Sequence, residues 1–456
     1  MVKMQRWKSK LQVRGVIMKK VVKFGGSSLA NAEQFQKVGD IIRSDESRRY
    51  VVPSAPGKRF DEDIKVTDML YGCYDAASKG EDITEKINAI KARYYEIIKG
   101  LGLSLSLEEE FKKIDEDFRA QAGIQYAASR GEFLNGKIMA AYLGYEFIDA
   151  AEVIVFDENG NFDGDKTHKI LSERLENTER AVIPGFYGAK PDGSIQTFSR
   201  GGSDITGSIV AKAVHADMYE NWTDVSGFLI ADPRIIKNPK PIDVITYREL
   251  RELSYMGATV LHEDAIFPVR KEGIPINIRN TNAPEDKGTL IVEDTCRKPR
   301  FTITGIAGKK DFASITIEKA MMNSEVGFCR KVLEVFENNN ISIEHMPSGI
   351  DTMTIFVHRD EFEEKEQDVI AGIHRAVEPD FLELESDLAL IAVVGRGMRA
   401  TRGTSGRIFA ALAHANVNVK MIDQGSSELN IIIGVRSHDF DAAINAIYDI
   451  FVKTMI

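Results

Sequence analysis

The stretch Lys20-Val-Val-Lys-Phe-Gly-Gly-Ser-Ser-Leu-Ala-Asn31 determines how the rest of this chain is interpreted. Its apolar, β-branched run predicts a strand, the two glycines predict a turn, and a helical pattern follows over residues 32–44. This unit suits an anion, because glycine lets the backbone approach closely and exposed N–H groups at a helix N-terminus donate to it. Lys23 adds a positive charge. The spacing of a Walker A loop is absent, and a turn that merely needs glycine explains the same residues.

Composition limits the function classes. The chain has 456 residues, 43% of them apolar and 28% charged, which is enough for two or three domains with real cores. The net charge of −10 argues against a nucleic-acid partner, which needs a basic face. No apolar run approaches the length of a membrane span, so we expect no membrane partner and a cytoplasmic location.

The cysteines argue against a disulfide-rich protein and against a metal site. Cys73, Cys296 and Cys329 are far apart, and the sequence has no Cys-x-x-Cys pair and no His/Cys cluster. Neither a disulfide framework nor a protein-held metal site is expected. Buried thiols in a reducing compartment are the simplest account.

The first 300 residues alternate strand and helix patterns, which predicts an α/β domain with a mostly parallel sheet. Helices are expected over residues 32–44, 83–101 and 203–214, and residues 75–125 are expected to form a helical insertion with solvated faces. The strand candidates are short, β-branched and bounded by Gly, Pro or Asp. They are Val21–Phe24, Tyr50–Pro53, Phe147–Asp149, Val153–Phe156, Ala181–Gly185, Met218–Trp222 and Ile276–Ile278.

The last part of the chain contains an internal repeat. At an ungapped offset of 76, apolar residues match apolar residues throughout; for example Ile315 matches Ile391 and Ile355 matches Ile431. Each unit has the pattern strand, Gly-containing turn, helix, strand, strand, helix, which predicts a small ferredoxin-like βαββα fold. We expect a disordered extension over residues 1–18, a first domain over 19–297, and two repeat units over 298–380 and 381–456.

Four polar segments of the first domain are expected to form a site, because three of them lie where a strand ends and a helix begins. They are Lys23–Ser28, Ser54–Lys58 with Thr67 shortly after, Ser129–Glu132, which we expect to open a helix, and Phe198–Asp204. A further segment, Asn221–Gly227, ends another strand and is followed by Ala231-Asp-Pro-Arg234.

Each segment also has a plain structural explanation. Glu132 could be a first-turn acid that complements a helix dipole, and Ser203 with Asp204 could be an N-cap pair. Asp232 before proline could start a turn. Taken together, however, Arg200 and Glu132 suit an amino acid, since a guanidinium pairs with its α-carboxylate and a carboxylate pairs with its ammonium.

In this order, the motifs Lys-Phe-Gly-Gly-Ser-Ser, Ser-Arg-Gly-Glu, Phe-Ser-Arg-Gly-Gly-Ser-Asp, Trp-Thr-Asp-Val-Ser-Gly and Ala-Asp-Pro-Arg make the chain resemble an aspartokinase. The tandem repeat resembles the pair of ACT domains that follows the catalytic domain in that family. The resemblance covers nearly everything from Lys19 onward. It implies an open, mostly parallel α/β sheet of amino-acid kinase type followed by two ferredoxin-like α+β ACT units. It also implies ATP with Mg²⁺ as phosphoryl donor, L-aspartate as acceptor, and a homodimer or higher oligomer.

Matching positions carry the family's expected roles. The phosphates are assigned to Lys23, Gly25, Gly26 and Ser27; the aspartate to Ser54, Thr67, Glu132, Phe186, Arg200, Gly201 and Ser203; the catalytic function to Lys23 and Asp204, the latter organising cations at the phosphates; and the nucleotide also to Thr223, Asp224, Leu229, Asp232 and Arg234. One position departs from the family. Thr259 stands where many members have a nucleotide-contacting lysine, so that cation is missing or is supplied by Lys58 or Arg234.

The resemblance also implies regulation by lysine, threonine or both through the first repeat. The effector residues expected there are Met322, Gly327, Phe328, Ser342, Ile343 and Glu344. Glu344 suits a cationic group, which favours lysine, although it could equally be a solvated strand residue.

Two other functions stay open at this point: a kinase of another amino acid, such as glutamate, and a sensor that uses the kinase fold only to bind. Because the sequence ends after the second repeat, no fused homoserine dehydrogenase is expected. The β-carboxylate of aspartate is already ionised at neutral pH, so the expected reaction needs no general base. Positive charge at the γ-phosphoryl group and correct positioning are what it requires.

Overall fold

The computed structural model describes residues 18–199, 201–258, 266–295 and 299–454. Contacts divide it into two compact units. The first contains residues up to 228 together with 243–247 and 260–296, and the second contains 229–242, 248–259 and everything from 297 onward. The boundaries expected at 298 and 381 stay predictions.

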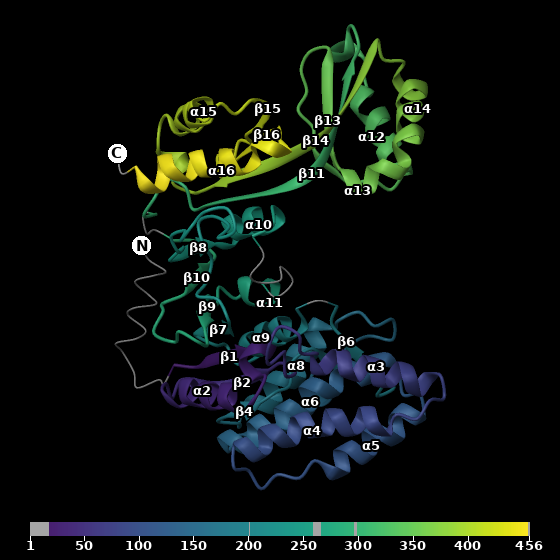
Figure 1. Cartoon of the computed structure of the whole chain (residues 1–456), viewed down its shortest axis with the longest axis vertical. Helices are drawn as coiled ribbons and strands as arrows, with labels where there is room; N and C mark the ends of the chain where they lie inside the picture. The colour runs from purple at the N-terminus through teal and green to yellow at the C-terminus, as the bar shows by residue number, and fades with distance from the viewer. Residues whose placement is uncertain (1–17, 200, 259–265, 296–298, 455–456) are drawn as a thin grey trace. The chain divides into compact units, whose positions relative to one another are not determined.

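The first unit is built on an eight-stranded, mostly parallel sheet, as predicted (Figure 1). Every neighbouring pair is parallel except β9 and β10. The strands lie in the order β3 (Glu146–Phe147), β4 (Ala181–Val182), β2 (Arg48–Pro53), β1 (Lys20–Phe24), β7 (Met218–Thr223), β9 (Ile276–Asn280), β10 (Thr289–Val292) and β8 (Val244–Thr246).

Strand alternation assigns the two faces of this sheet. Val22 and Phe24 of β1 pack into one apolar cluster with α2 (Ala32–Arg43) and α6 (Ile124–Leu143). The intervening residue Lys23 points to the other face, where α9 (Gly202–Ala213) lies against β1 and β7. A lysine in a core strand is therefore directed to one specific helix.

The helical insertion is confirmed. It consists of α3 (Val66–Ser78), α4 (Thr84–Gly100) and α5 (Glu108–Arg119), which pack with α6 and are drawn in blue tones in Figure 1. Their apolar sides join the cluster that covers β1, through residues such as Ile90, Tyr94 and Phe111. The insertion is thus an extension of the core of the first unit.

The smaller elements of the first unit complete the fold. The helices are η1 (Gly26–Leu29), α7 (Ala150–Val153), α8 (Gly164–Leu175) and α11 (Phe267–Arg270), and β5 (Tyr187–Ala189) pairs with β6 (Ile195–Thr197). The strand predicted over Val153–Phe156 is wrong. Asp149 accepts a hydrogen bond from the Ala151 N–H and caps α7, so the chain is helical up to Val153 and only Val155 and Phe156 form isolated bridges.

The second unit contains a six-stranded antiparallel sheet, ordered β12-β13-β11-β14-β16-β15. The first repeat comprises β11 (Gly305–Glu318), η3 (Met322–Ser324), α12 (Phe328–Asn338), β12 (Ile343–His345), β13 (Thr352–His358), α13 (Arg359–Phe362), η4 (Glu363–Lys365) and α14 (Glu366–Val377). The second comprises β14 (Phe381–Val394), η5 (Met398–Ala400), α15 (Thr404–His414), β15 (Val419–Asp423), β16 (Asn430–Arg436), η6 (Ser437–Asp439), α16 (Phe440–Tyr448) and η7 (Asp449–Lys453). Two βαββα units are therefore confirmed.

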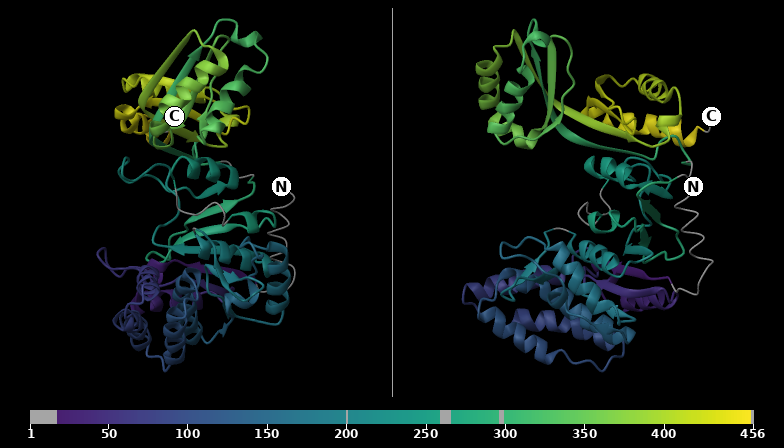
Figure 2. Two further views of the ribbon diagram at one scale, coloured as in Figure 1. Left: turned by 90° about the vertical axis from the view of Figure 1, so that its right-hand side faces the viewer. Right: turned by 180° about the vertical axis from the view of Figure 1, so that it is seen from behind.

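The two repeats share their central strands. β11 and β14, the long strands in Figure 2, pair along their whole length, from Gly305 opposite Val394 to Glu318 opposite Phe381. The first part of each strand therefore extends the sheet of the other repeat. Backbone conformation repeats as well. Positive φ recurs at the offset of 76 in three pairs: Asp311 and Asp387, Gly327 and Gly403, and Asn340 and Asn416.

The offset fails at the last strand of each repeat. Ile315 pairs with Ile355 in the first repeat, and Ile391 pairs with Ile433 in the second. The structural counterpart of Ile355 is therefore Ile433, and the predicted match to Ile431 is wrong. The second repeat has two extra residues between its last two strands.

Among the described residues, no helix is both long enough and apolar enough to cross a membrane.

Candidate active site

Four loops meet at the carboxyl ends of the adjacent strands β4, β2, β1 and β7. Backbone hydrogen bonds join them there. The Gly25 N–H donates to Trp222 O at 3.0 Å, and the Ser54 N–H donates to Phe24 O at 3.1 Å. The Gly185 N–H donates to Pro53 O at 3.1 Å. Two of the polar segments expected from the sequence, those after β1 and β2, therefore lie side by side at the edge where an open parallel sheet binds its ligands.

Lys23 forms an ion pair with an aspartate, and an asparagine donates a hydrogen bond to the same aspartate. Its Nζ lies 2.6 Å from Asp204 Oδ1, and Asn221 Nδ2 donates to the same oxygen at 2.9 Å. Lys23 and Asn221 are register partners on β1 and β7, so both side chains lie on the α9 face. Both residues are buried. Asn221 was not among the predicted site residues, although strand alternation and parallel register place its side chain beside Lys23.

The glycine turn is tight because two backbones touch. A Cβ on Gly26 would lie 2.9 Å from Ala55 O, so a side chain there would force the loops apart. Gly26 has an ordinary negative φ, so its glycine serves this approach and not a left-handed conformation. Gly26 is the first residue of the short 3₁₀ turn η1, and α2 begins later with Asn31 as its N-cap. Ser27 in this turn is exposed.

Glu132 is a buried acid in the middle of a helix. The prediction that Ser129–Glu132 opens a helix is wrong, because α6 begins at Ile124, where the first turn holds no acid. Glu132 therefore does not complement a helix dipole. It is 6% exposed, and its Oε2 has no hydrogen-bond partner among the described residues. Burial raises the pKa of Glu132 to about 7, opposed by backbone N–H groups, including that of Ala55, and by the charge of Lys23.

The start of α9 is shaped by close contacts. Gly201 is the N-cap with φ +64°, and no side chain caps the helix, so the N-cap explanation for Ser203 and Asp204 does not hold. Ser203 is buried, and a Cβ on Gly185 would lie 2.6 Å from its Cβ. Phe186 has φ +84°, a strained conformation for a non-glycine residue, which is fixed by its N–H bond to Thr206 Oγ1 at 3.0 Å.

The other predicted aspartate contacts lie on the β2 side. Ser54 follows β2, and its carbonyl accepts from Asn135 Nδ2 at 2.6 Å, so α6 contacts this loop as well as carrying Glu132. Thr67 is in the first turn of α3 and is half-buried. A Cβ on Gly131, the neighbour of Glu132, would lie 3.9 Å from Thr67 Oγ1. Thr67 and Glu132 therefore come from two helices, α3 and α6, that pack against each other.

The predicted nucleotide contacts divide between the two units. Thr223 and Asp224 end β7, where Thr223 Oγ1 donates to Asp224 Oδ1 at 3.1 Å. Leu229, Asp232 and Arg234 belong to the second unit. There Arg234 is largely exposed and pairs with Asp232 at 2.5 Å. Arg200 and Thr259 lie outside the described residues.

The effector residues predicted in the first repeat lie on η3, at the start of α12 and around β12. Met322 and Phe328 are buried, whereas Gly327 is the α12 N-cap with φ +85°. Ser342 is exposed and donates its N–H to Glu361. Ile343 and Glu344 are half-buried on β12. Glu344 Oε2 accepts a hydrogen bond from Tyr255 OH at 2.7 Å.

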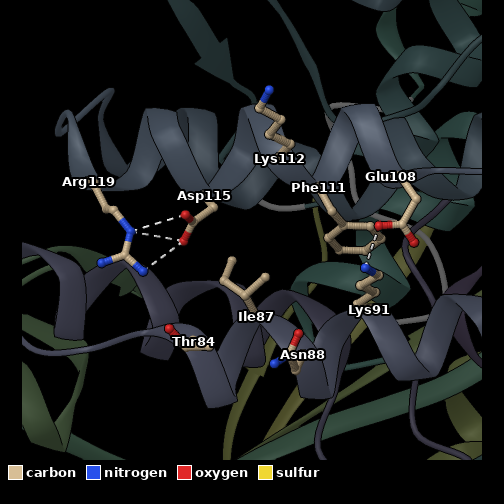
Figure 3. Close-up of a pocket in the computed structure, with 9 residues that line it drawn as sticks. All are labelled: Thr84, Ile87, Asn88, Lys91, Glu108, Phe111, Lys112, Asp115 and Arg119. Atoms are coloured by element: carbon tan, nitrogen blue, oxygen red, sulfur yellow. Dashed lines mark hydrogen bonds and ion pairs between the residues drawn. The ribbon is translucent and has the colours of Figure 1, made fainter.

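A separate cavity of about 240 Å³ lies between α4 and α5 (Figure 3). Figure 3 shows two pairs of oppositely charged groups turned toward each other. Lys91 pairs with Glu108 at 2.5 Å, and Arg119 pairs with Asp115 at 3.1 Å. None of the predicted site residues that the structure describes lines it. Four of its charged groups form two ion pairs, so they are not free to bind a ligand.

Comparison with known proteins agrees with this geometry. Residues 18–280 match the model of the amino acid kinase family, and residues 391–451 match an ACT domain model. The chain is 40% identical over 457 residues to aspartokinase 3 of Bacillus subtilis, covering 95% of this chain and 98% of the relative. The chain belongs to the aspartokinases of the amino acid kinase family.

Solved structures support the same placement of this aspartokinase. The aspartate kinase of Clostridium acetobutylicum is 52% identical, with a TM-score of 0.88 that covers 95% of this chain and 100% of that one. Aspartokinase III of Escherichia coli, solved with aspartate and ADP, is 24% identical and superposes with a TM-score of 0.71 over 95% of this chain and 99% of that one. At that identity it supports the fold alone. The aspartokinase described here is therefore an aspartate kinase with C-terminal ACT units.

Proposed function

We propose that this aspartokinase transfers the γ-phosphoryl group of ATP to the β-carboxylate of L-aspartate. A β-carboxylate oxygen attacks the γ-phosphorus, and the bond from that phosphorus to the β–γ bridging oxygen breaks. ADP leaves with the electron pair, and 4-phospho-L-aspartate forms. This is the first step of the aspartate pathway to lysine, threonine and methionine. The nucleophile is already an anion, so the site has to neutralise charge and does not have to remove a proton.

The observation that carries this proposal is the pairing of opposite charges around the glycine turn. Lys23 is buried and within 2.6 Å of Asp204. Glu132 is buried as well, and one of its oxygens has no hydrogen-bond partner within the described part of the chain. An ammonium group that entered the site would pair with Glu132, while phosphate oxygens would compete with Asp204 for Lys23. The site therefore suits an amino acid and a polyphosphate together.

Mg²⁺ fits the donor set. Mg²⁺ usually binds one or two carboxylates together with substrate phosphates and waters. Among the described residues, no group of three His, Cys, Asp or Glu side chains could hold a metal on its own. Asp204 is the carboxylate that would contact the ion, which would supply further neutralisation of the phosphate oxygens. The chain's own contribution is to orient the phosphates with the glycine turn and Lys23.

A second part of the proposal concerns regulation of the kinase. We propose that amino-acid binding to the ACT units inhibits the kinase, with lysine as the effector. Aspartokinase III of Escherichia coli has also been solved with lysine and aspartate bound, and it shares the fold of this chain. Glu344 provides a carboxylate for a cationic side chain on the first repeat.

The test is product analysis with purified full-length protein. Incubation with ATP, Mg²⁺ and L-aspartate should release ADP and give an acyl phosphate that hydroxylamine traps as the β-hydroxamate. L-Glutamate should react far more slowly, and N-acetyl-L-aspartate should not react, because it lacks the ammonium that pairs with Glu132. Equal rates with glutamate, or formation of the α-hydroxamate, would contradict the proposal.

A further inference from the structure

The loop that joins β2 to α3, residues 54–65, lies directly against the glycine turn. The Gly57 N–H donates to Gly26 O at 2.8 Å. A Cβ on Gly57 would lie 2.6 Å from the carbonyl carbon of Gly26 and 2.8 Å from Ser27 N. Movement of Gly57 would therefore change the shape of the turn that we assign to the phosphates.

A buried arginine from the helical insertion fixes both parts of this loop. Arg93 of α4 is 6% exposed. Its Nη2 donates to Gly57 O at 3.1 Å, and its Nη1 lies 2.8 Å from Asp63 Oδ2. One guanidinium group thus connects the start of the loop with its end. A planar guanidinium presents its N–H donors in a fixed fork, whereas an ammonium is a single point of charge.

Asp63 closes the loop onto itself. Its Oδ2 also accepts from the backbone N–H and the Nε of Arg59, both at 2.9 Å. The hydrogen bond from Arg59 and the charge of Arg93 hold the pKa of Asp63 well below its usual range, against the effect of its burial. Asp63 is therefore ionised throughout the neutral range and pairs with two guanidinium groups.

We propose that Arg93 is a positioning residue for the phosphate-binding turn. Arg93 acts through Gly57: its hydrogen bond to Gly57 O keeps the Gly57 N–H directed at Gly26 O, and its pair with Asp63 prevents the loop from swinging away. The assignment of phosphate to the turn rests on the proposed function, but the bracing itself does not. The helical insertion then has a specific task in the active site, since α4 supplies this brace.

Loss of the brace has two consequences. The Gly57 carbonyl and the Asp63 carboxylate would each lose a buried partner, which favours opening of the loop. A turn that is no longer held in one shape binds and orients phosphate less well, because part of the binding energy is used to order it. The effect should therefore appear in nucleotide binding and in catalysis with ATP.

The variants Arg93→Lys and Asp63→Asn test this in the full chain, with Arg119→Lys as control. Arg119 lies on α5 of the same insertion and pairs with Asp115, away from the loop. Hydrogen exchange of peptides covering residues 54–65 should be at least about tenfold faster in both test variants. The Kd for Mg·ADP, measured by calorimetry without aspartate, should rise about tenfold, and kcat/KM for ATP should fall by a similar factor. Arg119→Lys should match the unmodified protein in all three measurements.

Unchanged exchange in the loop and unchanged Mg·ADP affinity in the two test variants would overturn the proposal. So would a lower melting temperature accompanied by unchanged Mg·ADP affinity, since that is the result of a purely structural role. If Arg93→Lys does not fold, Asp63→Asn decides, because it leaves Arg93 in place and removes the carboxylate charge that Arg93 shares with Arg59. If the unmodified protein does not phosphorylate aspartate, the proposed function is wrong. Hydrogen exchange and Mg·ADP binding then still test whether Arg93 positions the turn.

Discussion

Lys23 and Asp204 form an ion pair between β1 and α9, with 2.6 Å between Nζ and Oδ1. Asn221 donates to the same carboxylate oxygen, so the pair has a fixed geometry. The pairing gives a buried ammonium an opposite charge as its partner while no phosphate is present. When phosphate oxygens arrive, Lys23 is already in position and needs little reorganisation, which is the basis of electrostatic catalysis.

Lys23→Ala should reduce kcat more than a hundredfold. Removal of one preorganised charge at the γ-phosphoryl group costs on the order of 3 kcal/mol in the barrier. Lys23→Arg keeps the charge but changes its shape, so it should recover only part of the rate. Lys37→Ala, which alters an exposed lysine on α2, is the matched control. A steady-state assay of ADP release measures all three, and turnover at the unmodified rate in Lys23→Ala would refute the phosphate site.

The apparent affinity for aspartate should depend on the ionisation of Glu132. Its pKa is about 7 without ligand, so below that pH the carboxyl is mostly neutral and cannot pair with an ammonium. The KM for aspartate should rise about tenfold between pH 8 and pH 6, because only the ionised fraction binds. In Glu132→Gln the KM should be high and nearly independent of pH, with the Kd for Mg·ADP little changed. A pH-independent KM in the unmodified enzyme would show that Glu132 does not contact the substrate.

Glu132→Gln should also stabilise the ligand-free protein at alkaline pH. The folded-state pKa of Glu132, about 7, lies above the unfolded value of 4.5, so the folded protein holds an extra proton between these values. Stability therefore falls as pH rises through this window, by up to about 3 kcal/mol, and the amide removes this loss.

Calorimetry should accordingly find a higher Tm for Glu132→Gln at pH 8 and a smaller difference near pH 5. Glu116→Gln, which alters an exposed residue of α5, should show neither effect. Saturating L-aspartate should raise the Tm of the unmodified protein more than that of Glu132→Gln. An equal Tm for Glu132→Gln and the unmodified protein at pH 8 would mean that a further partner stabilises the ionised carboxylate of Glu132.

Sequence patterns predicted the parts of the fold that depend on local order. Alternation around Lys23 and the glycines after Phe24 gave the first strand and its turn, and the repeat gave two βαββα units. The interior position of Glu132 was missed because the segment Ser129–Glu132 was expected to open a helix, with Glu132 in its first turn. In the structure Ser129 Oγ donates to Tyr126 O within α6, an alternative hydrogen bond that serine makes inside helices.

Residues that act across long sequence separations could not be predicted from local patterns. Arg93 is one residue of an amphipathic helix, and nothing near it in the sequence indicates that Gly57 and Asp63 are its partners. The same holds for Tyr255 and Glu344, which lie on different elements of the second unit. Asn221 was accessible to reasoning, since strand alternation and parallel register place it beside Lys23.

Arg396→Met should strongly destabilise the second unit. Arg396 Nη1 lies 2.7 Å from Glu249 Oε2, its N–H donates to Glu249 Oε1, and Glu249 is fully buried. Loss of the guanidinium removes a cationic partner from a buried carboxylate, which costs on the order of 3–5 kcal/mol. Arg399→Met, which alters an exposed neighbour, is the control. Scanning calorimetry should show a lowered transition that Glu249→Gln partly restores in the double variant; additive losses would mean that the two side chains are not coupled.

Glu344 should couple lysine binding to the ACT units with kinase activity. Its Oε2 accepts a hydrogen bond from Tyr255 OH at 2.7 Å, and a lysine ammonium would compete for the same carboxylate. An effector shifts a two-state equilibrium only by its differential affinity, typically about 1–3 kcal/mol. Glu344→Gln keeps an acceptor for Tyr255 but loses the charge, so the Ki for lysine should rise about tenfold or more while uninhibited kcat is preserved.

Glu344→Ala should relieve inhibition as well, and Glu364→Gln, at an exposed position of the same repeat, should not. Tyr255→Phe removes only the hydroxyl, so it should change the lysine response without changing uninhibited kcat. Activity measured against lysine and threonine, separately and together, decides the matter, because a lack of inhibition in the unmodified enzyme under all three conditions would exclude regulation by these amino acids.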